Sequence, residues 1–278
     1  MKKNLPGKGQ QNLRAYEGVE DLSTFTSQDA IEQYRQERKD FSSNAVSFLR
    51  KKMKNKKPMS VLDIGSGSSC FLYALHDEGA LAYGTGIEIS KTRHAFAEQW
   101  KRDGKYASVD NINQDVRTVS LDSKKFDACT ILDSTFTFFH SVAAQLPDQV
   151  LRRAYQVLNK DGWLIIDMSS FLDAKRLCKG SGIYYQWKEL PETNKFSYSL
   201  YKLNCSFKDD MVCTESRYIY RDKVGDFKKI EHSRMYTAPE LEKLVRKAGF
   251  KKTSFYSGYD GKPFNPRSSS RILLASQK

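Results

Sequence analysis

The chain has 278 residues, of which 39% are hydrophobic, and its 16 Phe and 15 Tyr can bury enough area to build a core. No apolar run reaches the length of a membrane-spanning helix, and residues 1–6 are not followed by the apolar stretch of a signal peptide, so we predict a cytoplasmic protein with no membrane partner. The five cysteines are scattered without a C-x-x-C pair, which argues against a disulfide framework and a zinc site.

The formal net charge of +13 is unevenly distributed along the chain. It is +6 over residues 1–57, −3 over residues 58–171 and +10 over residues 172–278. Basic flanks around a slightly acidic middle can attract an acidic small molecule or RNA, or they can be a solvated, lysine-rich surface. The charge therefore does not by itself select a partner.

The first predicted elements are helices, after a polar tail. The first ten or more residues are polar and contain glycine, which is typical of a mobile terminus. Residues 29–39 show a helical pattern with Ser27 as a cap, and a second helical segment, with Phe41 and Phe48 on one face, ends near Lys54. Residues 1–57 are therefore interpreted as a tail and a helical unit in front of the core.

A strand, a glycine turn and a helix follow in direct succession. The apolar run 59–64 predicts a strand buried on both faces, and Gly65 and Gly67 separate it from a helical segment that begins at Ser69. Glycines at a helix start let backbone N–H groups approach a polar or anionic ligand. Glu88 ends the next strand, 21 positions after Gly67, where a carboxylate can accept both hydroxyl groups of a ribose. These residues predict a nucleoside ligand.

Two other nucleotide sites fit this turn less well. A phosphate-binding loop needs a lysine directly after its last glycine, and the next lysine is Lys91; a dinucleotide fold needs a third glycine where Cys70 stands. Residues 61–67 instead resemble the first motif of class I methyltransferases that use S-adenosylmethionine as cofactor. The resemblance implies cofactor contacts by Asp63, Gly65, Ser66, Gly67, Glu88 and Ile89.

The resemblance continues in order along the chain. Residues 92–102 predict a helix and residues 106–109 a short strand. Asp115 and Val116 then stand where the family places an acid against the adenine amino group, and Asp110 is the competing acid. This segment is therefore expected to hold the base of the cofactor.

The fourth strand, residues 126–132, brings another acid to the same place. The resemblance assigns Leu132 and Asp133 to the cofactor as well. Because ligands of open α/β sheets lie across the carboxyl ends of the strands, the segments ending at Gly65, Glu88, Asp115 and Asp133 should converge on one crevice. The loop lacks the Asn/Asp-Pro-Pro-aromatic tetrad of enzymes that methylate amino groups of nucleic-acid bases, which disfavours such substrates.

His140 is the candidate general base. Residues 136–140 resemble a segment of glycine and amino-sugar N-methyltransferases in which a histidine follows the fourth-strand acid. An imidazole can take a proton from the substrate near neutral pH. The alternative is a histidine that only makes hydrogen bonds near a helix end.

The remaining sequence completes the core and adds a second unit. Residues 155–163 resemble the fifth motif of the family and lead into a buried strand at residues 163–168. Residues 172–236 alternate between apolar and polar side chains and predict an antiparallel insert, with a bulge near Leu200. Residues 237–278 predict a helix and the last two strands.

The resemblance also implies a substrate side. In the family the insert closes the active site, and N-terminal helices often form a lid over the cofactor. The residues chosen for these roles are Tyr34, Arg38, Tyr184, Trp187, Arg234 and Tyr236. The alternatives are a packed helix with solvated arginines and tyrosines that belong to the sheet or core.

The predicted fold class is therefore α/β: a Rossmann-like, seven-stranded methyltransferase sheet, residues 58–171 and 237–278, with helices on both faces, an N-terminal helical lid and an inserted antiparallel sheet. The predicted activity is methyl transfer from S-adenosylmethionine to a nitrogen or oxygen of a small molecule, without a metal, and the basic flanks allow that molecule to be acidic. The alternatives are an RNA or protein methyltransferase that uses the basic flanks, with nucleic acid not favoured, and a non-catalytic binding protein. A monomer and a homodimer fit equally.

Overall fold

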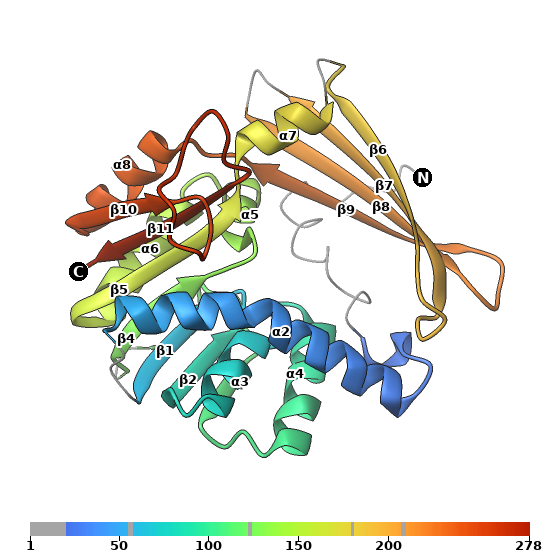
Figure 1. The fold of residues 1–278 in the computed structure, drawn as a ribbon, viewed down its shortest axis with the longest axis horizontal. Helices are drawn as coiled ribbons and strands as arrows, with labels where there is room; N and C mark the ends of the chain where they lie inside the picture. The colour runs from blue at the N-terminus through green and yellow to red at the C-terminus, as the bar shows by residue number, and fades with distance from the viewer. Residues whose placement is uncertain (1–20, 55–57, 122–123, 179–180, 207–209) are drawn as a thin grey trace.

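The structure, a computed structural model, describes residues 21–54, 58–121, 124–178, 181–206 and 210–278. The tail predicted before residue 21 lies outside the described residues. Within them the chain forms two β-sheets and the helices that pack on them (Figure 1). None of the described helices is long and apolar enough to span a membrane.

The larger sheet has seven strands in the order β10-β11-β5-β4-β1-β2-β3. They are β1 (Met59–Ile64), β2 (Leu81–Ile87), β3 (Val109–Ile112), β4 (Phe126–Ile131), β5 (Leu158–Ser169), β10 (Lys252–Tyr256) and β11 (Arg271–Gln277). Neighbours are parallel except where β11 pairs with β5 and β10. The chain winds outward on both sides of β1, so the carboxyl ends of β1, β2 and β4 lie at a topological switch point, where open sheets bind ligands.

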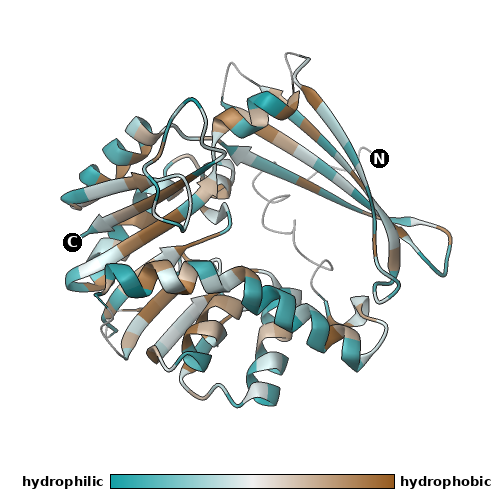
Figure 2. Ribbon diagram, in the orientation of Figure 1, coloured by the Kyte–Doolittle hydropathy of each residue, from teal (hydrophilic) through white to brown (hydrophobic). Residues whose placement is uncertain are grey.

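Helices cover both faces of this sheet (Figure 1). On one face lie α2 (Gln28–Lys52), α3 (Cys70–Asp77) and α4 (Lys91–Gly104), and on the other α5 (Thr135–Val142), α6 (Leu146–Val157) and α8 (Ala238–Ala248). In β1, Val61 packs against the helices of the first face, and Leu62 and Ile64 pack against those of the second face. The reason is that successive side chains of a strand point to opposite faces of the sheet. Figure 2 shows the resulting arrangement, with hydrophobic strands inside and a hydrophilic outer face on α2.

The helix α2 is continuous over 25 residues, whereas the sequence predicted two segments. No glycine or proline stands between residues 39 and 41, so the backbone hydrogen bonds are not interrupted there. The predicted cap is confirmed, since Ser27 Oγ accepts a hydrogen bond from the N–H of Ala30 at 3.1 Å.

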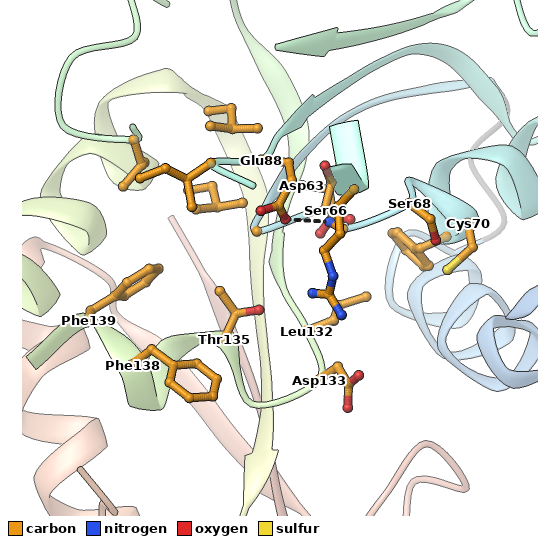
Figure 3. A pocket seen from close by; sticks show the side chains of 18 of the residues that line it. Asp63, Ser66, Ser68, Cys70, Glu88, Leu132, Asp133, Thr135, Phe138 and Phe139 are labelled. Carbon is orange, nitrogen blue, oxygen red and sulfur yellow. Dashed lines mark hydrogen bonds between the residues drawn. The ribbon is translucent and has the colours of Figure 1, made fainter. Parts of the chain in front are cut away.

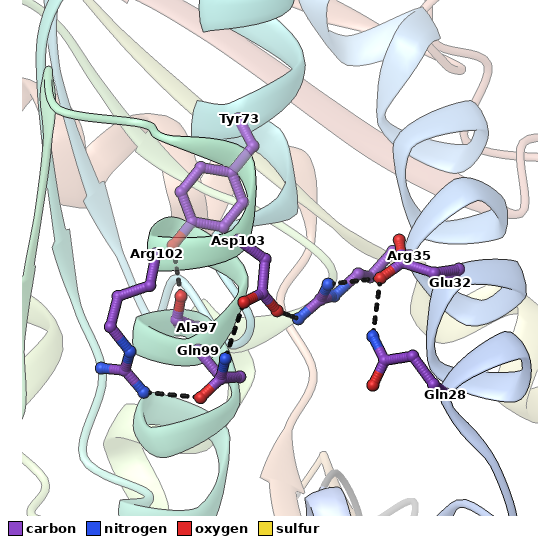
Figure 4. A network of polar contacts seen from close by, with 8 residues as sticks. All are labelled: Gln28, Glu32, Arg35, Tyr73, Ala97, Gln99, Arg102 and Asp103. Carbon is purple, nitrogen blue, oxygen red and sulfur yellow. Dashed lines mark hydrogen bonds and ion pairs between the residues drawn. The ribbon is translucent and has the colours of Figure 1, made fainter.

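A buried arginine fastens α2 to α4 (Figure 4). Arg35 is 3% exposed and donates hydrogen bonds of 2.7 Å to Asp103 on α4 and 2.7 Å to Glu32 on its own helix. Its guanidinium also lies 5.8 Å from the ring centroid of Phe96 and 5.7 Å from that of Trp100. Because a buried charge is costly unless it is paired, this contact fixes where α2 lies on the core.

The smaller sheet is antiparallel, as predicted, with strands in sequence order. Its strands are β6 (Ile183–Glu189), β7 (Phe196–Ser206), β8 (Met211–Tyr220) and β9 (Asp226–Arg234), and α7 (Phe171–Cys178) connects β5 to it. The turn residues 207–209 lie outside the described ranges. The register irregularity falls between Phe196 and Tyr198 and not near Leu200, so the predicted position of the bulge was wrong.

This sheet, called the insert below, is held at both ends (Figure 1). At one end α7 packs on Leu203 and Val212. At the other, the 3-10 helix η1 (Leu22–Thr24) and the residues before α2 meet the β6–β7 turn: the N–H of Lys195 donates to Thr24 C=O at 3.1 Å, and the N–H of Thr26 to Thr193 C=O at 3.2 Å. The insert therefore connects α7, which follows β5, with the residues that precede α2.

The bounds of β3 differ from the predicted ones. β3 covers Val109–Ile112 and not residues 106–109, because the ring of Tyr106 stacks on Tyr73 with ring centroids 4.4 Å apart. α6 begins at Leu146 with Pro147 in its first turn, where a missing N–H costs nothing.

Candidate functional site

A pocket opens at the carboxyl ends of β1, β2 and β4 (Figure 3). The glycine turn after β1, the ends of β2 and β4, the first turns of α5 and the middle of α2 line it. All ten residues predicted for the cofactor are among the lining residues: Asp63, Gly65, Ser66, Gly67, Glu88, Ile89, Asp115, Val116, Leu132 and Asp133. The structure thus brings four separate segments together, while the contact of each residue with a cofactor stays a prediction.

The glycine turn needs its glycines for two reasons. Gly65 and Gly67 have φ angles of 74° and 56°, which residues with a Cβ rarely adopt. A Cβ on Gly65 would also lie 2.3 Å from Cγ2 of Thr135, at the start of α5. Behind the turn, Ser68 Oγ is buried without a hydrogen-bond partner and lines the pocket. The turn therefore leaves space and an unused polar group beside the N-terminus of α3, which favours a polar ligand.

Glu88 is held by the turn that it faces (Figure 3). Its Oε2 accepts a hydrogen bond from the N–H of Gly67 at 2.8 Å, and its Oε1 accepts one from the N–H of Ser90 at 2.7 Å. The side chain is 7% exposed and lines the pocket. A carboxylate has about four acceptor positions, so two remain for donors such as the hydroxyl groups of a ribose.

Asp63 lies buried beneath the turn. Its Oδ1 accepts a hydrogen bond from Thr130 Oγ1 at 2.6 Å. Burial raises the pKa of Asp63 to about 7, with the nearby charge of Glu88 adding to the rise and the Thr130 hydrogen bond opposing it. Asp63 therefore titrates close to neutral pH in the folded protein.

Of the two acids considered for the adenine, only Asp115 lines the pocket. Its carboxylate is bound by Arg117, whose Nε lies 3.0 Å and 2.9 Å from the two oxygens. Burial alone would raise the pKa of Asp115, but the hydrogen bonds and charge of Arg117 lower it overall. Asp110 is instead paired with Lys124 at 3.0 Å.

Asp133 lines the pocket beside α2. Its side chain is 58% exposed, and Oδ2 lies 4.0 Å from Nη2 of Arg38, which also lines the pocket. Asp133 and Ser134 have φ angles of 48° and 66°, so the turn after β4 is strained. Of the residues predicted for the lid, Arg38 is thus placed at the pocket.

His140 does not line the pocket, although Phe138 and Phe139 on the same helix do. Successive residues of a helix point about 100° apart, which turns His140 away. Burial and the charge of Arg234 lower the pKa of His140, against a hydrogen bond with the backbone of Ala144. The structure agrees with the alternative interpretation, a hydrogen-bonding histidine near a helix end, and the catalytic role stays a prediction without support from its position.

The other residues predicted for the substrate side also lie outside the pocket. Tyr34 packs between α2 and α4, with its ring centroid 5.6 Å from that of Phe96, and Tyr236 is 2% exposed in the core beside Phe136. Trp187, on β6 of the insert, is 62% exposed. Two more are engaged elsewhere, Tyr184 against Tyr201 and Arg234 with Glu240. Apolar or aromatic character alone did not distinguish core positions and exposed strand positions from the pocket wall.

A polar contact at the pocket, between Tyr259 and Asp167, was not predicted from the sequence. Tyr259, from the loop between β10 and β11, lines the pocket, and its hydroxyl hydrogen bonds with Asp167 at the end of β5. Asp167 is also bound by Arg271, with Nε–Oδ1 at 2.9 Å and Nη2–Oδ2 at 2.7 Å. The available signal was Asp167 itself, a lone acid within an apolar strand. In the described parts of the chain, no three His, Cys, Asp or Glu side chains are grouped to hold a metal ion.

The sequence and the fold were compared with those of known proteins. Residues 62–166 match the family model described as a methyltransferase domain. No match was found among curated protein sequences. The fold is similar to that of the CcbJ methyltransferase from Streptomyces caelestis, with a TM-score of 0.70 and 14% identity, over 84% of this chain and 88% of that one.

Two further solved structures share the fold. One is S-adenosylmethionine-bound CalS10, an amino pentose methyltransferase from Micromonospora echinaspora, with a TM-score of 0.65 and 16% identity over 91% of this chain and 98% of that one. The other is the sugar N-methyltransferase KedS8 from a Streptoalloteichus species, with a TM-score of 0.60 and 17% identity over 87% and 86%. The predicted fold class is confirmed, as is the resemblance over the motif-bearing residues 62–166.

Proposed function

We propose that this chain is an S-adenosylmethionine-dependent methyltransferase and that it transfers a methyl group to a nitrogen or oxygen of a small molecule. The match of residues 62–166 to the methyltransferase domain model supports the proposal. The observation that carries the proposal is the convergence of four strand ends on one pocket with Glu88 tied to the glycine turn. In this arrangement Glu88 accepts the ribose hydroxyls, Asp115 faces the adenine, and Arg38 is available to the methionine carboxylate.

Methyl transfer from a sulfonium requires mainly that the protein position the two reactants. The sulfonium methyl is already activated, so the acceptor attacks it in line, a new bond to carbon forms, and the electron pair of the broken C–S bond stays on sulfur. The enzyme contributes by holding both reactants in line and by excluding water. Phe138 and Phe139, which line the pocket, supply an apolar wall beside the reacting carbon.

The way the insert is held bears on the size of the acceptor. The insert is hydrogen bonded to the residues before α2 at one end and packed on α7 at the other, which favours a small acceptor over RNA or a folded protein. CalS10 is described as an amino pentose methyltransferase and KedS8 as a sugar N-methyltransferase. These likenesses favour a nitrogen on a polar small molecule.

Calorimetry with S-adenosylhomocysteine tests the cofactor site. We expect the wild type to bind it and Glu88→Gln to bind about 100-fold more weakly, because an amide cannot keep the two backbone donors and also accept two hydroxyls. Glu242→Gln, which breaks an exposed ion pair with Arg246, is the matched control and should bind like the wild type. Equal affinities for Glu88→Gln and the control would remove the basis of the proposal.

A further inference from the structure

Two buried cysteines lie side by side where α7 meets the insert. Cys178 is the last residue of α7 and Cys205 lies on β7, and their sulfur atoms are 2.9 Å apart. They are separated by 27 positions in the sequence, so no C-x-x-C motif indicates the pair. Both are free thiols, and one of them can donate its S–H to the other.

The backbone holds both residues in place. The N–H of Cys205 donates to the C=O of Gly182 at 2.8 Å, and the N–H of Ser181 donates to the C=O of Cys178 at 3.1 Å. The Cys205 thiol also lies 3.8 Å from the C=O of Ala174, one turn before Cys178 on α7. The contact between the two sulfurs is therefore fixed by hydrogen bonds of the chain on both sides of it.

The other three cysteines, all within the described residues, lie elsewhere. Cys213 on β8 pairs with Asn204, the residue before Cys205, so its side chain points to the opposite face of the insert. Cys70 and Cys129 pack in the cores on the two faces of the larger sheet. Each of the paired thiols therefore has the other as its nearest possible partner.

An apolar cluster encloses the pair. Both cysteines are buried, together with Phe171, Leu203 and Val212. Burial, with Cys178 beside it, raises the pKa of the Cys205 thiol. Because the thiolate is the reactive form, the pair should react slowly while the cluster is closed and faster when this part of the insert opens.

We propose that Cys178 and Cys205 form a reversible disulfide when the protein is exposed to a low-molecular-weight disulfide such as oxidised glutathione, and that this bond holds β6 on the rest of the insert. Bond formation brings the sulfurs closer by less than about 1 Å, so little rearrangement is needed. Neither cysteine lines the pocket, so the inference does not depend on the proposed function.

The reaction balances with one molecule of the oxidant. A protein thiolate attacks one sulfur of glutathione disulfide, the S–S bond of the oxidant breaks, and one glutathione leaves as a thiolate. The second protein thiolate attacks the protein sulfur of this mixed disulfide and displaces the other glutathione. Two protein thiols are oxidised, one glutathione disulfide is reduced to two thiols, and the two protons pass to the departing thiolates.

The bond acts on β6 because β6 is an edge strand. In the described sheet it pairs with β7 alone, and its Tyr185 and Trp187 are exposed. A bond between Cys178 and Cys205 closes a covalent loop that contains all of β6 and its turn to β7. Loop closure removes open conformations of the chain, so β6 should separate from β7 less often.

Thiol mapping of the full chain tests the bond. The protein is incubated at pH 8 with mixtures of oxidised and reduced glutathione, in urea just below the unfolding transition, so that local opening gives access to buried thiols. The remaining thiols are then alkylated. Mass spectrometry is expected to find two peptides joined through Cys178 and Cys205, with the loss of two hydrogen atoms, and dithiothreitol is expected to separate them.

The matched control is Cys213→Ala, which removes a cysteine from the other face of the same sheet and should form the bond as the wild type does. Cys178→Ala and Cys205→Ala should each leave the other cysteine free or joined to glutathione, and either variant serves if its counterpart does not fold. A wild type in which both thiols remain open to alkylation, carry only glutathione, or join Cys213 would overturn the disulfide.

Hydrogen exchange of the oxidised and reduced wild type tests the effect on β6. Amides of β6 should exchange at least about 10-fold more slowly in the oxidised form. β9, the opposite edge strand of the insert, lies outside the covalent loop and should exchange alike in the two forms. Equal exchange of β6 in both forms would overturn the role of the bond in holding this strand.

Discussion

The carboxylate of Glu88 accepts a hydrogen bond from the backbone N–H of Gly67 at 2.8 Å, so the end of β2 and the turn after β1 form one unit. The N–H of Gly65 adds to this by donating to the C=O of Ile87 at 2.8 Å. A ligand held by Glu88 is therefore placed at a fixed distance from the glycine turn.

Gly65→Ala should lower both stability and affinity for S-adenosylhomocysteine. The added Cβ meets Thr135, and the positive φ costs a further 1–2 kcal/mol, roughly, for any residue but glycine. Gly79→Ala is the matched control, because Gly79 has a φ of 62° but no atom within 4 Å of the added Cβ. We expect Gly79→Ala to lower the free energy of unfolding by about 1 kcal/mol, which is the conformational cost of the positive φ alone, and denaturant unfolding measures this loss. The affinity of this variant for S-adenosylhomocysteine should not change. Equal losses in the two variants would show that Thr135 does not matter.

Asp63→Asn should change how stability depends on pH. The pKa of Asp63 is about 7 in the folded protein and near 3.8 ordinarily, so between about pH 4 and 7 the folded state keeps a proton that the unfolded chain releases. The contribution of Asp63 to the free energy of unfolding therefore falls as pH rises through this range. Asn can still accept the hydrogen bond of Thr130 and does not titrate. Denaturant unfolding at pH 5, 6, 7 and 8 measures this. The free energy of unfolding of the variant should rise relative to that of the wild type as the pH increases. Parallel pH dependences of the two proteins would contradict the raised pKa.

Asp103→Asn should destabilise the contact between α2 and α4. It removes one of the two carboxylates that pair with Arg35, whose side chain is 4% exposed, and leaves Glu32 as the charged partner. Loss of one charged hydrogen bond at a buried arginine costs about 1–3 kcal/mol. The comparison is Glu242→Gln, which breaks the exposed pair with Arg246 on α8 and should cost less than about 1 kcal/mol. Urea unfolding of both variants measures the difference. Similar small losses would mean that α2 is held by its apolar face alone.

Arg234→Gln should raise the pKa of His140. The positive charge of Arg234 disfavours the imidazolium form, and its removal leaves mainly the effect of burial. Titration of the His140 ring by nuclear magnetic resonance measures this directly. His140→Gln should leave S-adenosylhomocysteine affinity unchanged, because His140 does not line the pocket. A large loss of affinity in His140→Gln would require a contact that the present geometry does not contain.

The fold was predictable wherever the signal is local. The alternation at Val61 and Leu62, the cap at Ser27 and the glycine turn each follow from a few neighbouring residues, and their order along the chain gave the seven-stranded sheet and the residues that share the pocket. The ends of strands were also sufficient to find Glu88 and Asp133, because parallel strands present their carboxyl ends together.

The remainder depends on contacts between residues far apart in sequence. Asp167 meets Arg271 across 104 positions and Arg35 meets Asp103 across 68, and no spacing rule predicts such pairs. The single helix α2 was divided because its apolar pattern is interrupted, although its backbone is not. Aromatic residues of the insert were assigned to the substrate from the sequence pattern alone, although Trp187 is 62% exposed and does not line the pocket.

The continuity of α2 links two regions that would otherwise be independent. Residues just before its first turn are hydrogen bonded to the insert, and three turns further along Arg38 and Phe41 line the pocket. Because one uninterrupted helix carries both contacts, a displacement of the insert at the start of α2 is expected to shift Arg38 and Phe41 as well. The fit of the insert and the width of the pocket should therefore change together.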